Sequence, residues 1–392
     1  MDCDWNRPAT AEINLDHFEF NIHQIRKKIP TDNRICIAVK ANAYGHGLVE
    51  ISRFAKEKLK IDYLAVAVIS EAIRLRKNKI PGPVLLFGGL LPEDIPFLFE
   101  YQITPSIINF EMAHLINQYA LDHGRIIPVH VVVDTGMGRV GFHHPHAVED
   151  IIELQSMRGL LLEGIYTHFP VSDDPDKTFT RNQIEILKSI ILKLENQGIR
   201  IPIRHCANSA AIIDLDMDFF TMVRPGVMIY GLYPAPEVDH RFPLRQIMTL
   251  KSRIVYLKEV EAGRSISYGR TYIPSRRTII ATIPIGYGDG INRRLSSCGE
   301  ALVEGHRVPI AGRVTMDQLM LDLGNLPDDR PPQLGDEVVL YGCQGNQEIK
   351  IDDVAQQLST IPYEVTCWIN ERVPRTYFYQ GREITDQIRE IR

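Results

Sequence analysis

The sequence predicts an α/β protein with a (β/α)8 barrel of the TIM type over residues 1–243 and a mostly β domain over residues 244–392. In the first part, short β-type runs alternate with helical patterns about eight times, which indicates a parallel sheet covered by helices. Eight such units within about 250 residues favour a closed barrel, with an open doubly wound sheet as the alternative. After Pro243, β-type runs follow one another between Gly, Pro and Asp residues.

The predicted barrel strands share short runs of aliphatic and β-branched residues: 35–39, 63–68, 83–88, 103–107, 128–134, 160–168, 202–208 and 221–231. Apolar residues at helical spacing predict the covering helices: 48–59, 70–78, 93–102, 110–122, 146–157 and 176–198. The second domain has β-type runs at 247–260, 276–285, 300–314, 319–324 and 336–342. Only 351–359 has a clear helical pattern there.

Composition excludes several classes of protein. With 44% hydrophobic and 24% charged residues the chain is an ordinary globular one. Its 44 basic and 49 acidic residues give a net charge of −5, which offers no reason to expect nucleic acid or an anionic membrane as a partner. No apolar stretch approaches the roughly 18 residues of a membrane helix, and the acidic N-terminus does not resemble a signal peptide. Six scattered cysteines without a C-x-x-C pair predict reduced thiols and a cytoplasmic protein.

In a barrel of this type, functional residues gather where the strands end. That rule selects an amine, two guanidiniums, an imidazole and a hydroxyl near predicted strand ends: Lys40, Arg139, Arg224, His168 and Ser209. The set is rich in cations, so we expect the pocket to bind an anionic ligand.

Lys40 is the strongest single candidate. Five apolar residues precede it and a glycine-containing turn follows. Partial burial disfavours the charged form of a lysine and makes it a better nucleophile, able to form a Schiff base with a carbonyl. A surface lysine at a strand end is the plain alternative.

Two other motifs are given less weight. Residues 136–141 match the dinucleotide-binding pattern G-x-G-x-x-G, but they follow the fifth predicted strand, and no acidic residue about 20 positions later completes the unit. His143, His144 and His146 lie close together, yet a solvated loop explains them better than a metal site does. We therefore expect neither a Rossmann nucleotide site nor a metal.

Ordered motifs along nearly the whole chain resemble those of alanine racemases, which are pyridoxal-phosphate enzymes. The cofactor-lysine motif is AVKANAYGHG at 38–47. One matching block, RPATAEINLDHFEFNI, precedes this motif. The others come after it in the family's order: DTGMGRVGF, YTHF, ANSAA, VRPG, SYGRTY, IGYGDG, GRVTMDQ and IPYEVTCWINERVPR. The resemblance implies pyridoxal 5'-phosphate as cofactor and a cytoplasmic enzyme that supplies D-alanine for peptidoglycan. It also implies a homodimer in which each second domain completes the partner's active site.

The resemblance also implies residue roles. Lys40 would be the Schiff-base lysine and one base, and Tyr268 from the partner subunit would be the other. The cofactor would be held by Tyr44, His168, Ser209, Arg224, the amides of Gly226 and Val227, and Tyr363. The substrate would be bound by Arg139 and the backbone amide of Met316, with Tyr287 and Tyr363 narrowing the pocket for a methyl side chain.

Racemisation fits two opposed bases, because one face of a planar intermediate loses a proton and the other gains one. A tyrosine is a poor base at neutral pH because its pKa is about 10, and we expect positive charge on His168 or Arg224 to favour its phenolate. An arginine cannot be deprotonated. Arg224 is therefore expected to keep the pyridine nitrogen unprotonated, which would limit transamination.

One position departs from the family. Many members have a carbamylated lysine seven residues before the substrate-binding arginine, where this chain has Val132. Arg139 therefore lacks that anionic partner, and we expect a bound anion such as chloride, or another residue, near it.

Three other functions remain open from the sequence. A serine or broad-spectrum racemase shares the fold, since a small pocket rejects one added hydroxyl poorly; rates on D-alanine and D-serine would distinguish it. A non-catalytic pyridoxal-phosphate carrier would lack the second domain and Tyr268. A decarboxylase on the same barrel is disfavoured by the residues around Tyr268.

Overall fold

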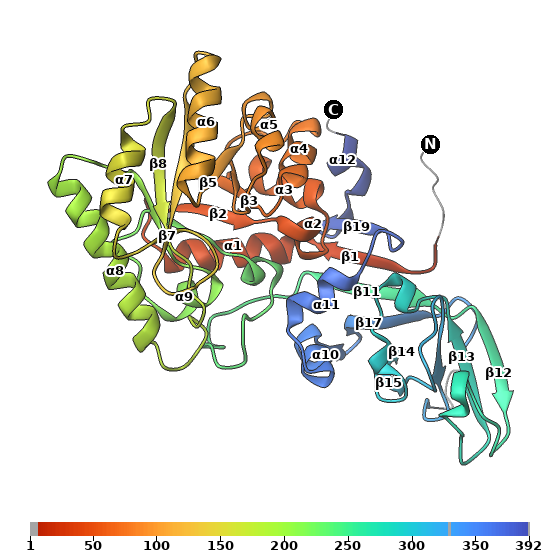
Figure 1. Cartoon of the computed structure of the whole chain (residues 1–392). Coiled ribbons are helices and arrows are strands. Elements are labelled where there is room, and N and C mark those ends of the chain that lie inside the picture. Colours follow the sequence, from red (N-terminus) through yellow and green to blue (C-terminus); the bar gives the residue numbers. More distant parts are fainter. Residues whose placement is uncertain (1–6, 328–330, 391–392) are drawn as a thin grey trace.

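The computed structural model describes residues 7–327 and 331–390. Figure 1 shows a barrel surrounded by helices, joined to a strand-rich domain beside it. Within those residues, no helix combines the length and the apolar character needed to traverse a bilayer.

The barrel has eight strands, each parallel to its neighbour, in the order β10-β2-β3-β4-β5-β6-β8-β9. They are β2 (Arg34–Ala38), β3 (Tyr63–Val66), β4 (Val84–Leu86), β5 (Thr104–Ile107), β6 (Ile127–Asp134), β8 (Leu160–Tyr166), β9 (Ile203–His205) and β10 (Met222–Val223). Two backbone hydrogen bonds from the residues that flank β10 close the ring, from Thr221 N to Arg204 O of β9 (2.9 Å) and from Arg224 N to Ala207 O, just after β9 (2.8 Å). The predicted barrel is confirmed, and the open sheet is excluded.

Helices cover the outside of the barrel. They are α1 (Leu15–Lys28), α3 (Leu48–Glu57), α4 (Ile69–Lys77), α5 (Ile95–Glu100), α6 (Phe110–Asp122), α7 (Ala147–Gln155), α8 (Thr178–Asn196) and α9 (Ser209–Asp214). In α8, Ile184, Leu187, Ile191 and Leu194 recur at helical spacing and are buried, so one apolar stripe faces the sheet. A short strand, β7 (Phe142–His143), pairs with β6.

The second part of the chain is built mainly of strands, as predicted. They are β11 (Met248–Arg253), β12 (Tyr256–Val260), β13 (Thr278–Ile283), β14 (Glu300–Val303), β15 (His306–Pro309), β16 (Leu319–Asp322), β17 (Glu337–Gln344), β18 (Gln347–Ile349), β19 (Arg375–Tyr379) and β20 (Arg382–Glu383). Short 3-10 helices interrupt the chain: η1 (Pro92–Asp94), η2 (Val227–Tyr230), η3 (Tyr268–Arg270), η4 (Tyr287–Asp289) and η5 (Arg293–Leu295). Strands β12, β13 and β16 form a small antiparallel sheet of their own.

The first strand of the chain lies in the second domain's larger sheet. β1 (Thr10–Asn14) pairs antiparallel with β11 and parallel with β19. Ala11 and Ile13 alternate with polar neighbours and are fully buried. The first described strand therefore lies in the second domain's sheet and the chain enters the barrel after it. The boundary near residue 243 stays a prediction.

The expectation of a single clear helix in the second part was wrong. Besides α10 (Ile351–Leu358), the structure has α11 (Pro362–Trp368) and α12 (Thr385–Glu390). α11 starts at a proline, whose fixed φ suits a first helical position. Its Val365 and Thr366 are β-branched residues with low helix propensity, and both are buried, so packing stabilises a helix that the local pattern does not indicate.

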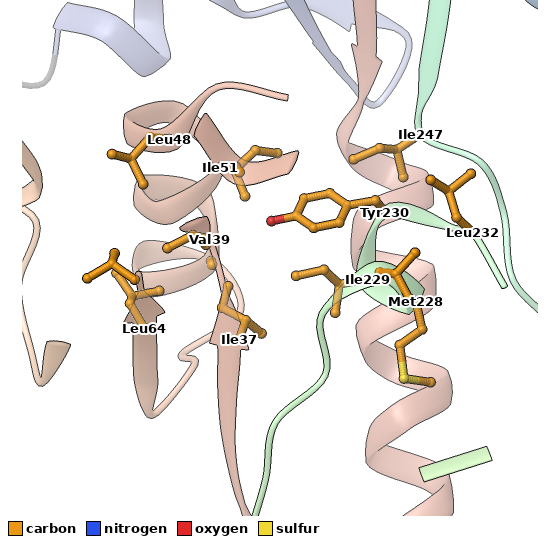
Figure 2. Packing of buried hydrophobic residues seen from close by; sticks show 14 of the residues in the cluster. Ile37, Val39, Leu48, Ile51, Leu64, Met228, Ile229, Tyr230, Leu232 and Ile247 are labelled. Carbon is orange, nitrogen blue, oxygen red and sulfur yellow. The ribbon is translucent and has the colours of Figure 1, made fainter. Parts of the chain in front are cut away.

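Figure 2 shows the core beside the start of the barrel. Ile37 and Val39 pack near Leu48 and Ile51 of α3, with the Tyr230 ring close by. Tyr230 is fully buried, and its hydroxyl donates to the carbonyl of Ala38 (2.8 Å). This contact fixes the chain two residues before Lys40.

Candidate active site

A cavity of about 530 Å³ opens where the barrel strands end. Nine of the twelve predicted site residues line it: Lys40, Tyr44, Arg139, His168, Ser209, Arg224, Gly226, Val227 and Tyr363. Eight of these come from the barrel part, and Tyr363 comes from α11. The rule that strand ends carry function therefore selected residues that share one cavity.

The other three predicted residues lie elsewhere, on loops of the second domain. The exposed fractions are 72% for Tyr268, 53% for Met316 and 42% for Tyr287. The three loops are tied together, since Ser267 Oγ donates to Arg313 O (2.7 Å) and Gly288 N donates to Met316 O (2.8 Å). They form one exposed cluster that does not line the cavity of the same chain.

Lys40 stands at the start of an unusual turn, α2 (Lys40–Tyr44). Ala41, Asn42, Ala43 and Tyr44 all have left-handed φ angles between 51° and 56°. Such a conformation costs roughly 1–2 kcal/mol per residue that is not glycine, so the surrounding structure must hold it. Glu71 Oε1 accepts from Ala41 N (2.6 Å), and Asn42 Oδ1 accepts from Leu48 N (2.9 Å).

Gly45 closes this turn against α11. Its φ is +86°, and a Cβ there would lie 2.1 Å from the carbonyl oxygen of Thr366. Only glycine fits such a close approach. The turn is thus fixed from both domains, and it directs Lys40 to the cavity.

Burial lowers the pKa of Lys40, and the nearby Arg139 guanidinium lowers it further. Glu71 and Cys367 act in the opposite direction but do not cancel the effect. A larger share of the amine is therefore neutral and nucleophilic than in an exposed lysine.

Hydroxyl groups and backbone amides meet at one end of the cavity. Ser209 Oγ accepts from Gly226 N (3.0 Å), and the ring centroids of Tyr44 and Tyr363 lie 6.2 Å apart. Gly226 lies so close to Tyr44 that an added Cβ would come within 3.0 Å of its hydroxyl. Burial raises the pKa of Tyr44, which keeps that hydroxyl neutral and able to donate. This cradle suits a small group with several acceptor oxygens, such as a phosphate.

Arg224 is buried in the wall of the cavity. Its Nη2 donates to Thr167 O (2.8 Å) and to Cys206 O (3.2 Å), and its Nη1 donates to His205 Nδ1 (2.9 Å). The guanidinium also lies over the ring of Tyr166, 4.9 Å from its centroid. These contacts fix both the charge and its orientation.

His168 is neutral. Burial is the main cause that lowers the pKa of His168 to about 3, and Arg224 and Arg139 add to it. Arg224 Nη2 lies 3.2 Å from His168 Nδ1, which must accept because arginine only donates. The expectation that a charged His168 favours the phenolate of Tyr268 was wrong, and of the two groups only Arg224 carries the charge.

Arg139 is exposed, and no side chain within 7–327 or 331–390 forms a hydrogen bond or ion pair with it. Val132 lines the same cavity and is 4% exposed. The carboxylate of Asp134 is occupied by its own loop, where it accepts from Gly136 N (2.9 Å) and Gly138 N (3.1 Å). The backbone amides of the glycine-rich loop thus bind the carboxylate of Asp134. Separately, the described part of the chain contains no group of three His, Cys, Asp or Glu side chains that could hold a metal ion.

Two residues that support the site were missed in the sequence. Glu71 lies in the predicted helix 70–78 and was not singled out for the site, yet its carboxylate accepts from Ala41 N and also from Ala67 N (2.9 Å). His205 lies in a predicted strand and was not singled out. Ile203 and His205 are two residues apart in a barrel strand and therefore lie on the same face. Because an isoleucine on that face is expected to point inward, this spacing was the available signal for His205.

The comparisons with known proteins agree with this geometry. A sequence model of the alanine racemase N-terminal domain matches residues 13–234, and one of the C-terminal domain matches residues 247–377. An alanine racemase of Desulforamulus reducens is 44% identical over 372 residues, 94% of this chain and 99% of that protein. The structure of an alanine racemase of Clostridium difficile 630 has a TM-score of 0.90 at 40% identity and covers 96% of this chain and 97% of that chain. Its complex with cycloserine has a TM-score of 0.88 at 38% identity, with the same coverage.

Both family domains and full-length relatives thus match along one chain whose cavity contains a lysine of lowered pKa and the hydroxyls of Tyr44 and Ser209 beside Gly226. The chain belongs to the alanine racemase family, isomerases that use pyridoxal 5'-phosphate to interconvert L-alanine and D-alanine.

Proposed function

We propose that this chain racemises alanine with two opposed bases, Lys40 of one subunit and Tyr268 of the partner subunit. One observation carries the proposal: the cavity holds Lys40 with a lowered pKa, while Tyr268 stands on an exposed cluster of loops outside that cavity. A second subunit that places this cluster over the cavity would complete the site. The proposal therefore includes a homodimer with shared active sites.

The residues of the cavity fit the cofactor. Tyr44, Ser209, Tyr363 and the amides of Gly226 and Val227 would hold the phosphate, and the space that a Cβ at Gly226 would fill is kept open. Pyridoxal 5'-phosphate, when bound, supplies the electron sink that makes the α-proton of an amino acid acidic. Lys40 Nζ would remove or return that proton on one face, and the hydroxyl of Tyr268 would do so on the other.

Substrate recognition would combine both subunits. Arg139 and the backbone amide of Met316 would bind the carboxylate, and Tyr287 with Tyr363 would leave room for a methyl group. Neutral His168 would accept at Nδ1 from Arg224 and support Tyr268 through Nε2. A second candidate is a racemase that also takes serine, because Val132 changes the surroundings of Arg139.

The direct test measures α-proton exchange. We expect the purified protein to exchange the α-proton of L-alanine in deuterated water and to accumulate D-alanine. Bound cofactor without exchange would contradict the proposal and favour a non-catalytic carrier.

We expect Arg224→Glu to raise the number of amino-group transfers to the cofactor per racemisation. The guanidinium can donate a hydrogen bond to the pyridine nitrogen but cannot transfer a proton to it, whereas a carboxyl group can. The cofactor's amine form would be counted against D-alanine produced. Arg224→Gln is the matched control, and an unchanged ratio in Arg224→Glu would count against this role.

We expect the KM for alanine to depend on chloride. Arg139 has no anionic partner among the described residues, and a bound anion would orient it. Replacing chloride by a bulky anion should raise KM roughly two- to fivefold, since a partly exposed ion pair contributes up to about 1 kcal/mol. In Val132→Asp, which supplies a carboxylate of similar size, the dependence should disappear; a KM independent of chloride in the parent would refute the bound anion.

We place the enzyme in the cytoplasm, where it would supply D-alanine for peptidoglycan. Cys36, Cys206, Cys298, Cys343 and Cys367 are free thiols, as expected in a reducing compartment. Cys3 lies outside the described residues.

A further inference from the structure

A row of four polar side chains crosses the interior of the barrel from the cavity toward the opposite end. Arg224 Nη1 lies 2.9 Å from His205 Nδ1, and His205 Nε2 lies 2.9 Å from His130 Nδ1. His130 Nε2 in turn lies 3.4 Å from Glu163 Oε2. Arg224 and both histidines are buried, whereas the Glu163 side chain is 27% exposed.

The two ends of the row determine where the protons lie. Arg224 only donates, so His205 Nδ1 accepts and His205 carries its proton on Nε2. His130 Nδ1 must then accept from His205, and His130 carries its own proton on Nε2, the ring nitrogen that lies 3.4 Å from the carboxylate. Both hydrogen bonds of the row thus point from the guanidinium toward Glu163, and His130 Nε2 then faces that carboxylate at 3.4 Å, outside hydrogen-bond geometry.

The charges agree with this order. Burial lowers the pKa of His130 and of His205, so both rings stay neutral, with one donor and one acceptor nitrogen each. The nearby His130 lowers the pKa of Glu163, and Tyr63 lowers it further, so this carboxyl stays ionised.

The barrel has two local features that allow the row to form. A Cβ at Gly164 would lie 2.5 Å from the His130 ring, so only glycine leaves room for that imidazole. The pairing of β6 and β8 also shifts, from Val129 opposite Leu162 to His130 opposite Gly164. The extra residue in this bulge is Glu163, and bulges commonly redirect a side chain.

We propose that Glu163 and His130 are positioning residues that hold Arg224 in place by fixing the tautomer of His205. If His205 carried its proton on Nδ1, an N–H would face the guanidinium and displace it. The inference rests on the proposed function, in which Arg224 faces the pyridine nitrogen, and it extends that function to the far end of the barrel.

The test compares two substitutions at Glu163 in the holoenzyme. Glu163→Lys presents only donors to His130, so His130 Nε2 should accept and His130 Nδ1 should donate. His205 would then carry its proton on Nδ1, facing the guanidinium of Arg224. We expect kcat to fall on the order of tenfold, as for other coupled networks, with KM for alanine unchanged within about twofold and more amino-group transfer to the cofactor per turnover. Glu163→Gln can still accept through its amide oxygen and should stay close to the parent.

Two further variants make the result specific. Glu100 is exposed and lines the same surface hollow as Glu163 outside the row, so Glu100→Lys makes the same charge change and should behave as the parent. Gly164→Ala displaces the His130 ring without removing a polar group, and a folded variant should reproduce the effects of Glu163→Lys.

Parental kcat and parental amino-group transfer in Glu163→Lys, beside an active parent, would overturn this inference alone. An equal loss in Glu100→Lys would overturn it as well, because surface charge would then be the cause. A parent that does not racemise alanine would overturn the proposed function and this inference with it.

Discussion

Lys40→Ala is expected to abolish racemisation, with a fall in kcat of about 10³-fold or more, since a positioned base alone contributes 10²–10⁴-fold. The substitution removes both the amine that attaches the cofactor and one of the two bases. Racemisation would be followed by the appearance of D-alanine, and cofactor attachment by the visible absorption of the lysine-bound chromophore, which should disappear.

The matched control is Lys58→Ala, at an exposed lysine just after α3. It removes an ordinary surface amine from the same region and should leave rate and spectrum as in the parent. A Lys40→Ala protein that keeps the chromophore unchanged, or that racemises at the parental rate, would contradict the role of Lys40.

The position of Lys40 was predictable because it depends on local sequence. An apolar strand followed by a polar, glycine-containing turn places a lysine at the strand end of a barrel, whatever the rest of the chain does. The left-handed conformation of residues 41–44 was not predictable, since Ala and Tyr disfavour it. It is held by Glu71 and by the close approach of Thr366 to Gly45, contacts between segments far apart in the sequence.

The contrast between local sequence and contacts of distant segments also explains which other features of the fold and site could not be predicted. The alternating pattern predicted the barrel, but β1 pairs with strands more than 200 residues later in the chain, which no local pattern indicates. The charge state of His168 depends on burial beside two guanidiniums. The row behind Arg224 depends on a bulge and on one missing Cβ. Each of these is a property of three-dimensional packing.

The exposed loop cluster around Tyr268 lies outside the cavity of its own chain, and a partner subunit would give it a role in the site. The exposed Tyr268 and Met316 lie on loops that hydrogen bonds tie together, and neither residue lines the cavity of its own chain. Placed over a cavity that has one base, they would supply a second base and a backbone donor. The proposed sharing of the site between two subunits can therefore be tested by placing each substitution on a different chain.

Tyr268→Phe alone should lower racemisation by about 10²–10⁴-fold, as expected for the loss of one general base. Proton exchange on the face served by Lys40 should continue, because that base remains. Exchange of the α-proton of each enantiomer in deuterated water would be compared with conversion. Equal loss of exchange for both enantiomers would contradict the assignment of one base to each face.

Mixing the two inactive variants is expected to restore activity. If each site takes its lysine from one subunit and its tyrosine from the other, a hybrid dimer of Lys40→Ala and Tyr268→Phe has one site with both native residues and one with neither. An equal mixture with random pairing contains about half hybrids, so about a quarter of parental activity should return. If both bases came from one chain, every site would lack one of them and no activity would return. Activity that appears only after the subunits are allowed to exchange would therefore identify Tyr268 of the partner subunit as the second base.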